Sequence, residues 1–259
     1  MGKQWDKVYS GNLSETIRIS QRVYLRKGNL PVRDQCNTGI IHGKTGLILV
    51  DLPEQCPEEE ILEEAELFWG KPVTHLLFTH AHGDHRKGLA SLKRRNLTLV
   101  SSFAAQKEIQ VCYPDLSVQN WMTPENGEEL ELDGVRFQFW IPQKLPAHSP
   151  WDMSICLPEE AIVFTGDFVV PPFYMYNYSG NEKNWCDALK HFRESYETKL
   201  LLMGHGDPAE GKDILPELIQ YLTCLGELYE SVQYLAEKTD RDTVLRQLRE
   251  IGESKGMCD

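Results

Sequence analysis

Apolar and polar positions alternate in short runs along the 259-residue chain, without one long repeat. Runs rich in β-branched and aromatic residues predict strands. Nine segments show this pattern: Thr16–Leu25, Thr38–His42, Thr45–Asp51, Val73–Thr79, Leu97–Ser101, Glu129–Ile141, Met153–Leu157, Ala161–Thr165 and Lys199–Met203.

Between several of these strands, apolar residues recur at the three- and four-residue steps that place them on one face of a helix. The longest such pattern runs from Ile214 to about Glu237, where Pro216 is acceptable because it falls in the first turn. The other predicted helices are Pro57–Trp69, Arg86–Arg95, Phe103–Gln110 and Glu182–Glu197. Strands mixed with helices predict an α/β protein whose sheets are covered by helices, but periodicity leaves the strand order open.

No Ser/Gly-rich or low-complexity linker divides the chain, so we expect a single domain over residues 1–259, with C-terminal helices from about residue 213.

The net charge of −12 argues against a nucleic-acid partner, because phosphate backbones would be repelled. The first residues do not show the cationic segment followed by an apolar segment that is typical of a secretory leader. No apolar run approaches the roughly 18 residues that a membrane helix needs. The seven dispersed cysteines include no Cys-x-x-Cys pair, which favours a reducing compartment. We therefore expect a cytoplasmic protein that acts on a small molecule.

The candidate chemistry is concentrated in Thr79–His85, which reads Thr-His-Ala-His-Gly-Asp-His and directly follows an apolar run. Imidazole and carboxylate groups are established metal ligands. His80 and His82 are two residues apart and share one face if the backbone stays extended. Asp84 and His85 are adjacent and diverge, so the stretch suits two neighbouring metals better than one.

This stretch resembles the signature of the metallo-β-lactamase superfamily. The other positions that the resemblance requires follow in order: Asp51 after a strand, His148 in a loop, Asp167 in Gly-Asp and His205 in Gly-His. The resemblance covers roughly residues 15–235. It implies a four-layer αββα sandwich, in which two β-sheets lie between helical layers.

The resemblance also implies a set of ligands. His80, His82 and His148 would bind a first metal, Asp84, His85 and His205 a second, and Asp167 would bridge the two. All offer nitrogen or oxygen, so zinc is the default and iron or manganese are alternatives. Two metals about 3.5–4 Å apart can share a hydroxide and polarise a scissile group. The implied activity is hydrolysis of a small ester, thioester, lactone or phosphodiester, with Asp84 and Asp167 as catalytic residues.

A bridging Asp167, in place of serine or cysteine, resembles glyoxalase II, lactonases, phosphodiesterases and nucleases of the superfamily and disfavours antibiotic hydrolysis. The glyoxalase II-like branch is the nearest general likeness, although Pro146-Ala-His-Ser-Pro departs from its Gly-His-Thr-x-Gly pattern. One alternative is an oxygenase resembling the persulfide dioxygenases, with a single iron on His80, His148 and Asp167. Another is a nuclease resembling transfer-RNA processing enzymes, which the acidic balance disfavours.

Several residues outside the ligand set have predicted roles of their own. Asp51 is predicted to hydrogen-bond the backbone or a ligand imidazole without binding metal. His75 is predicted to be a packed or surface histidine. The aromatic residues Phe173, Tyr174, Tyr176 and Tyr178 are predicted to form a lid over the pocket. The long helix from Ile214 either covers the core or forms the face of a homodimer.

Overall fold

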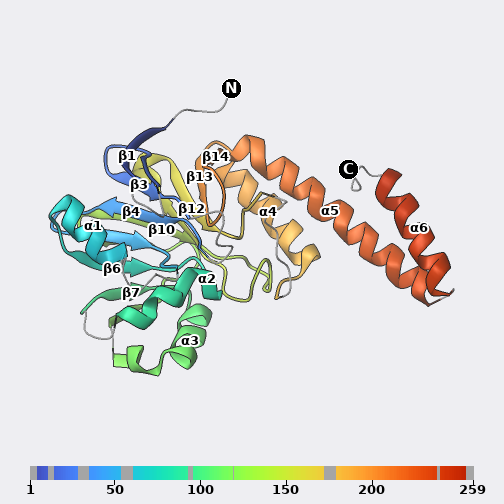
Figure 1. Cartoon of the computed structure of the whole chain (residues 1–259), viewed down its shortest axis with the longest axis horizontal. Coiled ribbons are helices and arrows are strands. Elements are labelled where there is room, and N and C mark those ends of the chain that lie inside the picture. Colours follow the sequence, from blue (N-terminus) through green and yellow to red (C-terminus); the bar gives the residue numbers. More distant parts are fainter. Residues whose placement is uncertain are drawn as a thin grey trace.

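The structure is a computed structural model that describes residues 5–10, 15–28, 35–53, 61–92, 96–118, 120–171, 179–237 and 240–254. Two β-sheets pack face to face, and helices cover both outer faces (Figure 1). The predicted αββα sandwich is therefore confirmed in the described residues.

The first sheet has eight strands, which lie side by side in the order of the sequence. Neighbours from β1 to β5 run antiparallel, whereas β5 to β8 run parallel. Parallel strands end at the same edge, so this half of the sheet brings loops together there. The strands are β1 (Asp6–Ser10), β2 (Glu15–Arg18), β3 (Val23–Arg26), β4 (Thr38–His42), β5 (Leu47–Val50), β6 (Val73–Leu77), β7 (Thr98–Val100) and β8 (Asn120–Met122).

The second sheet has six strands in the order β14-β13-β12-β11-β10-β9. Only β12 and β13 form a parallel pair, and their ends face the same side as those of β5 and β6. The strands are β9 (Glu129–Leu132), β10 (Val135–Trp140), β11 (Ser154–Leu157), β12 (Ile162–Gly166), β13 (Leu200–Met203) and β14 (Ala209–Glu210).

Three apolar layers hold the sandwich together. Side chains from both sheets fill the central layer, which contains Phe137 and Phe139. The outer face of the first sheet packs on α1 and α3, and that of the second packs on α4 and α5. The helices are α1 (Ile61–Trp69), α2 (Gly83–Arg86), α3 (Phe103–Cys112), α4 (Glu182–Tyr196), α5 (Gly211–Ala236) and α6 (Arg241–Ser254), with 3-10 turns η1 (Lys87–Ser91), η2 (Pro114–Val118) and η3 (Pro158–Glu160).

Two predicted strands are in fact hairpins. Thr16–Leu25 contains β2 and β3, separated by a turn in which the Ser20 hydroxyl accepts hydrogen bonds from the amides of Arg22 and Val23. Glu129–Ile141 contains β9 and β10, joined at Asp133 and Gly134, which have φ values of 46° and 74°. The single-strand predictions were wrong because the apolar alternation continues through both turns.

Helix boundaries also differ from the predictions. The helix predicted from Arg86 begins at Gly83 and continues as a 3-10 turn to Ser91. The long helix begins at Gly211 rather than Ile214. Its far half extends away from the sheets, with α6 beside it (Figure 1). None of the helices in the described part of the chain combines the length and apolar character that a membrane crossing requires.

Candidate metal centre

The residues predicted as ligands meet at one edge of the sandwich, between the ends of parallel strands. His80 follows β6 of the first sheet, with α2 carrying Asp84 and His85 just beyond it. Asp167 follows β12 and His205 follows β13 in the second sheet. The two sheets therefore supply opposite sides of the same site, as loops at the carboxyl ends of parallel strands commonly do.

The first group of side chains consists of three histidines. The His82 Nδ1 atom lies 3.0 Å from His80 Nε2 and 3.1 Å from His148 Nε2, and all three side chains are buried. Burial lowers the pKa of His80 well below its ordinary value, lowers that of His82, and lowers that of His148 to about 3. The three rings are therefore neutral at neutral pH, which is the form that binds metal.

The second group consists of Asp84, His85, Asp167 and His205. His205 Nε2 lies 3.0 Å from Asp84 Oδ2 and 3.6 Å from Asp167 Oδ2. His85 Nε2 lies 3.3 Å from Asp167 Oδ1 and 3.6 Å from Asp84 Oδ2. These imidazole and carboxylate atoms converge on a common point, much as the three histidine nitrogens do.

The charges of this second group follow from its geometry. Burial alone would raise the pKa of Asp167, but His85 and His205 beside it hold that pKa well below the ordinary value. Burial would likewise raise the pKa of Asp84, but His85 and His205 beside it hold that pKa below the ordinary value. Conversely, burial would lower the pKa of His205, but Asp167 and Asp84 raise it. Both acids are therefore carboxylates at neutral pH.

The spacing of the donor atoms fits divalent metal ions. Within each group, the candidate ligand atoms all lie within 4.8 Å of one another. Ligands bound to zinc at about 2.0–2.2 Å in tetrahedral geometry stand roughly 3.3–3.6 Å apart, close to the spacing found here. In the described part of the chain, the buried atoms His85 Nε2 and Asp167 Oδ1 make no hydrogen bond. The two atoms lie 3.3 Å apart without forming a hydrogen bond, and a metal ion would satisfy both of them.

Two glycines keep the site open. Gly166 has a φ of 53°, and a Cβ atom there would lie 2.2 Å from Thr79 Oγ1. A Cβ atom at Gly204 would lie 2.2 Å from Asp167 Oδ1 and 2.6 Å from His85 Cε1. A side chain at Gly166 would displace Thr79, which contacts Asp51, and a side chain at Gly204 would displace the candidate ligands themselves.

Several hydrogen bonds orient the candidate ligands. Asp51 Oδ2 accepts from Thr79 Oγ1 at 2.7 Å and contacts His85 Nδ1 at 2.8 Å. The contact predicted for Asp51 is therefore confirmed. His82 Nε2 lies 2.8 Å from Ser179 Oγ, which leaves Nδ1 to face the other two histidines. Such outer contacts fix the tautomer and orientation of a metal-binding imidazole.

Two residues near the site were not predicted. Cys36 is buried, forms a third cluster with Asp51 and His85, and has a pKa raised to about 12 by burial, so it is a neutral thiol. Asn37 joins the two sheets, since its Nδ2 donates to the Met203 and Gly206 carbonyls at 3.0 and 2.9 Å. Both residues precede β4 and carry no local pattern that would have revealed these distant contacts.

The loop that carries His148 is held from within. Asp152 accepts a hydrogen bond from the Ser149 amide at 2.8 Å and another from its hydroxyl. Burial raises the pKa of Asp152 to about 7, against the lowering effect of these bonds.

His75 is half-buried and contacts Thr74 Oγ1 at 2.8 Å, as predicted for a packed histidine. The predicted aromatic lid, residues 172–178, lies outside the described residues.

Sequence comparison places this site in a known family. The sequence model of the metallo-beta-lactamase superfamily matches residues 31–205. An atrochrysone carboxyl ACP thioesterase, dmxR1 of Cryptosporiopsis sp. (strain 8999), is 27% identical over 162 residues, which are 61% of this chain and 47% of that protein. The chain spans about half the length of the curated relatives it matches.

Solved structures show the same fold. A metallo-beta-lactamase from Pontibacter korlensis superimposes with a TM-score of 0.70 at 19% identity, covering 81% of this chain and 99% of that one. The metallo-beta-lactamase FIM-1 from Pseudomonas aeruginosa, in its mono-zinc form, gives a TM-score of 0.68 at 19% identity, with 82% and 95% covered. At this level of identity, the likeness concerns the fold alone.

Proposed function

The chain belongs to the metallo-beta-lactamase superfamily, and we propose that it is a hydrolase that uses two zinc ions to cleave a small thioester or ester. The position of Asp167 is the observation that carries this proposal. Its Oδ2 atom lies 3.6 Å from His205 Nε2 in the second group and 3.9 Å from His148 Nε2 in the first. One carboxylate therefore faces both groups of donors, which supports a bridging role.

In this proposal, His80, His82 and His148 would hold one ion, Asp84, His85 and His205 would hold the other, and Asp167 would serve both. When bound, the ions would polarise the substrate carbonyl and make a water molecule nucleophilic at neutral pH. Asp167 and Asp84 offset the positive charge that the ions bring into a buried site. The Asp84 side chain is 23% exposed, compared with 10% for Asp167, so Asp84 is the carboxylate better placed to accept the proton of the attacking water.

The thioester assignment is supported by the thioesterase names of relatives that share 27–31% of aligned residues with this chain. The reaction adds water to the carbonyl carbon and breaks the carbon–sulfur bond. The leaving thiolate takes up one proton of the water, and the other is released as the acid product ionises to a carboxylate. The described cysteines Cys36, Cys112, Cys156, Cys186 and Cys224 are all free, which supports a reducing compartment such as the cytoplasm.

The proposal can be tested by measuring metal content and thioester cleavage on the same preparations. The wild type should hold about two metal equivalents per chain and release thiol from small acyl thioesters. His205→Ala and His148→Ala should each lower the content toward one equivalent and abolish thiol release. His191→Ala is the matched control, because His191 lies exposed on α4. A single tightly held iron, unchanged in His205→Ala and accompanied by oxygen consumption, would instead support the oxygenase.

A further inference from the structure

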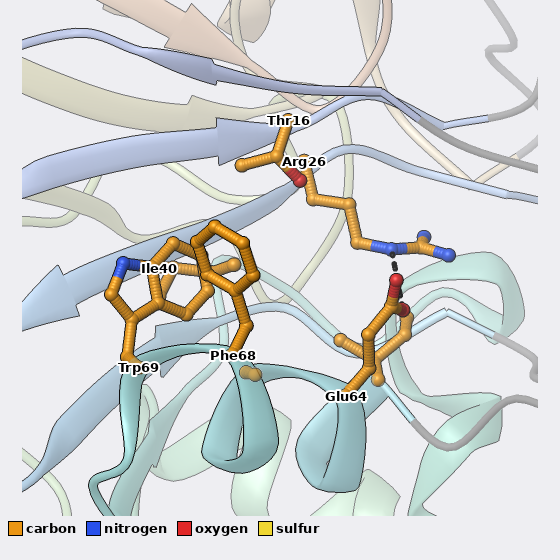
Figure 2. A pocket seen from close by; sticks show the side chains of 8 residues that line it. Thr16, Arg26, Ile40, Glu64, Phe68 and Trp69 are labelled. Carbon is orange, nitrogen blue, oxygen red and sulfur yellow. Dashed lines mark ion pairs between the residues drawn. The ribbon is translucent and has the colours of Figure 1, made fainter. Parts of the chain in front are cut away.

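Four acidic or basic side chains other than histidine are buried among the described residues. Arg26, on β3, forms an ion pair with Glu64 of α1 at 3.9 Å (Figure 2). Asp51 and Asp167 lie in the metal centre and contact its histidines. Asp152 differs, because it is only 1% exposed and makes no ion pair with any residue in the described part of the chain. A buried carboxylate without a cationic partner is costly, so its hydrogen bonds must compensate.

The hydrogen bonds of Asp152 close a tight turn in the loop that carries His148. Its Oδ2 atom accepts from the Ser149 amide at 2.8 Å, and its Oδ1 atom accepts from the Ser149 hydroxyl at 2.5 Å. The Ser149 hydroxyl oxygen in turn accepts from the Trp151 amide at 3.2 Å. Side-chain bonds of this local kind fix the path of the backbone without a helix or a strand. Residues 149–152 therefore hold one another in place directly after the histidine.

This turn is attached to both halves of the sandwich. On the side of the first sheet, the Met153 amide donates to the Thr79 carbonyl at 2.8 Å, just beyond β6. On the side of the second sheet, the Asn181 amide donates to the Ala147 carbonyl at 2.8 Å, where α4 begins. While the turn keeps its shape, these bonds fix His148 relative to both sheets.

His148 depends on its backbone more than the other candidate ligands do. Its Nδ1 atom is buried and makes no hydrogen bond to any described residue. By contrast, a hydroxyl meets the outer nitrogen of His82 and a carboxylate meets that of His85. The Trp185 ring packs against His148 with 5.1 Å between ring centroids, but this contact supplies no hydrogen bond. The usual partner that orients a metal-binding imidazole is therefore absent from the described surroundings of His148.

From these contacts, we propose that Asp152 is a positioning residue for the first metal ion. By holding the turn, it keeps His148 Nε2 beside His82 Nδ1, 3.1 Å away, where both nitrogens can reach one ion. It does through the backbone what an outer hydrogen bond does for the other histidines. The inference rests on the proposed function only in that His80, His82 and His148 bind a metal ion. It does not depend on the identity of the substrate.

Asp152→Ala tests the proposal, with Asp115→Ala at an exposed position of η2 as the control. Competition with a chromophoric chelator measures the zinc affinity of both sites in the full chain. In Asp152→Ala the affinity of the first site should fall about 10- to 100-fold. The second site should keep its affinity, because none of its ligands lies in this turn. Asp152→Asn should show an intermediate loss, since only one of its two polar atoms can accept a hydrogen bond.

Two ligand variants assign the loss to a site. Added to His205→Ala, which weakens the second site, Asp152→Ala should leave little bound zinc. Added to His148→Ala, which already lacks a first-site ligand, it should change the zinc content little further, because the two residues act on the same site. A general structural role would instead weaken both sites alike. Equal weakening of the two sites, or a first-site affinity unchanged in Asp152→Ala, would overturn the proposal.

If Asp152→Ala does not fold, Asp152→Asn and Ser149→Ala carry the test, because each removes only part of the turn. Both should lower the affinity of the first site severalfold and leave that of the second site unchanged. Wild-type affinity at the first site in both variants would equally reject the positioning role. Failure of the proposed function is separate, because it would appear in the wild type as the absence of two zinc equivalents or of thiol release.

Discussion

His85 Nδ1 lies 2.8 Å from Asp51 Oδ2, although the two residues are 34 positions apart in the chain. Asp51 also accepts a hydrogen bond from the Thr79 amide at 2.8 Å. Together these contacts turn His85 Nε2 toward Asp84 and Asp167. Asp51 has a φ of 59°, in the left-handed region that residues other than glycine seldom adopt. Backbone strain of this kind is concentrated at functional sites, where the surrounding structure maintains it.

The first prediction follows from this contact. Asp51→Asn keeps the side-chain shape and tolerates the left-handed backbone, but it replaces one of the two acceptor oxygens with an amide group. Affinity for metal should fall about 10- to 100-fold, as for other losses of an outer contact to a ligand histidine. Competition with a chromophoric chelator measures this affinity. Asp115→Asn, at an exposed position in η2, should leave it unchanged. If Asp51→Asn binds metal as tightly as Asp115→Asn does, the contact of Asp51 with His85 does not support metal binding.

The second prediction concerns Asp167, which faces both donor groups. Asp167→Ala should lower kcat for thioester cleavage by about 100-fold or more, while KM changes much less, because the loss falls on the reacting centre rather than on substrate binding. Steady-state kinetics that follow the released thiol provide the measurement. Near-normal kcat in this variant would show that the bridging role is wrong.

The third prediction compares two glycine substitutions. Gly204→Ala should abolish metal binding and lower the free energy of unfolding by about 1–3 kcal/mol, since its Cβ would collide with Asp167 and His85. Gly226→Ala, on α5, meets no atom within 4 Å and should stabilise the protein by up to about 1 kcal/mol. Thermal unfolding and metal analysis of both variants test the pair. A stable, metal-loaded Gly204→Ala protein would contradict the close approach described above.

The fourth prediction concerns the metal-free protein at low pH. Burial lowers the pKa of His148 from 6.5 to about 3 in the folded state, so the unfolded chain binds the proton more readily. The stability that this neutral histidine contributes is present above pH 6.5 and is lost as the pH falls toward 3.

Urea unfolding of the metal-free protein at about pH 7 and about pH 5 should therefore show lower stability at the lower pH, by up to about 1.4 kcal/mol per pH unit for this group. His148→Phe should reduce that pH dependence, whereas His191→Phe on the exposed face of α4 should retain it. Identical slopes for wild type and His148→Phe would show that His148 does not carry the effect.

The α/β class could be predicted from periodicity, whereas the layered fold and the grouping of the candidate ligands were implied by the resemblance to the superfamily. His80, His82, Asp84 and His85 lie within six residues, and the superfamily pattern identifies Asp167 and His205 after later strands. The Asp133-Gly134 turn was missed although such a pair is itself a hairpin signal. The turn at Ser20 depends on a hydroxyl that bonds two backbone amides, and an alternating pattern does not reveal this.

Contacts between residues far apart in sequence could not be predicted. Cys36 and His85 are brought together by the pairing of β4 with β5 and by the loops that leave them. Ser179 reaches His82 from a loop of the opposite sheet. Arg26, in an otherwise ordinary strand, gave no sign that it would be buried under α1. Each case depends on sheet register and docking, which single-residue patterns do not encode.

The bonds of Asn37 have a consequence for how this protein assembles. Asn37 lies immediately before β4 and donates hydrogen bonds to the carbonyls of Met203 and Gly206, on both sides of His205. It therefore links one half of the sandwich to the other. Each of the two groups of donors takes residues from both halves, so neither group is complete before the halves have docked. Under the proposed function, full metal binding would therefore come late in folding, after the long loops have closed. Removal of bound metal should then let the two halves separate more readily.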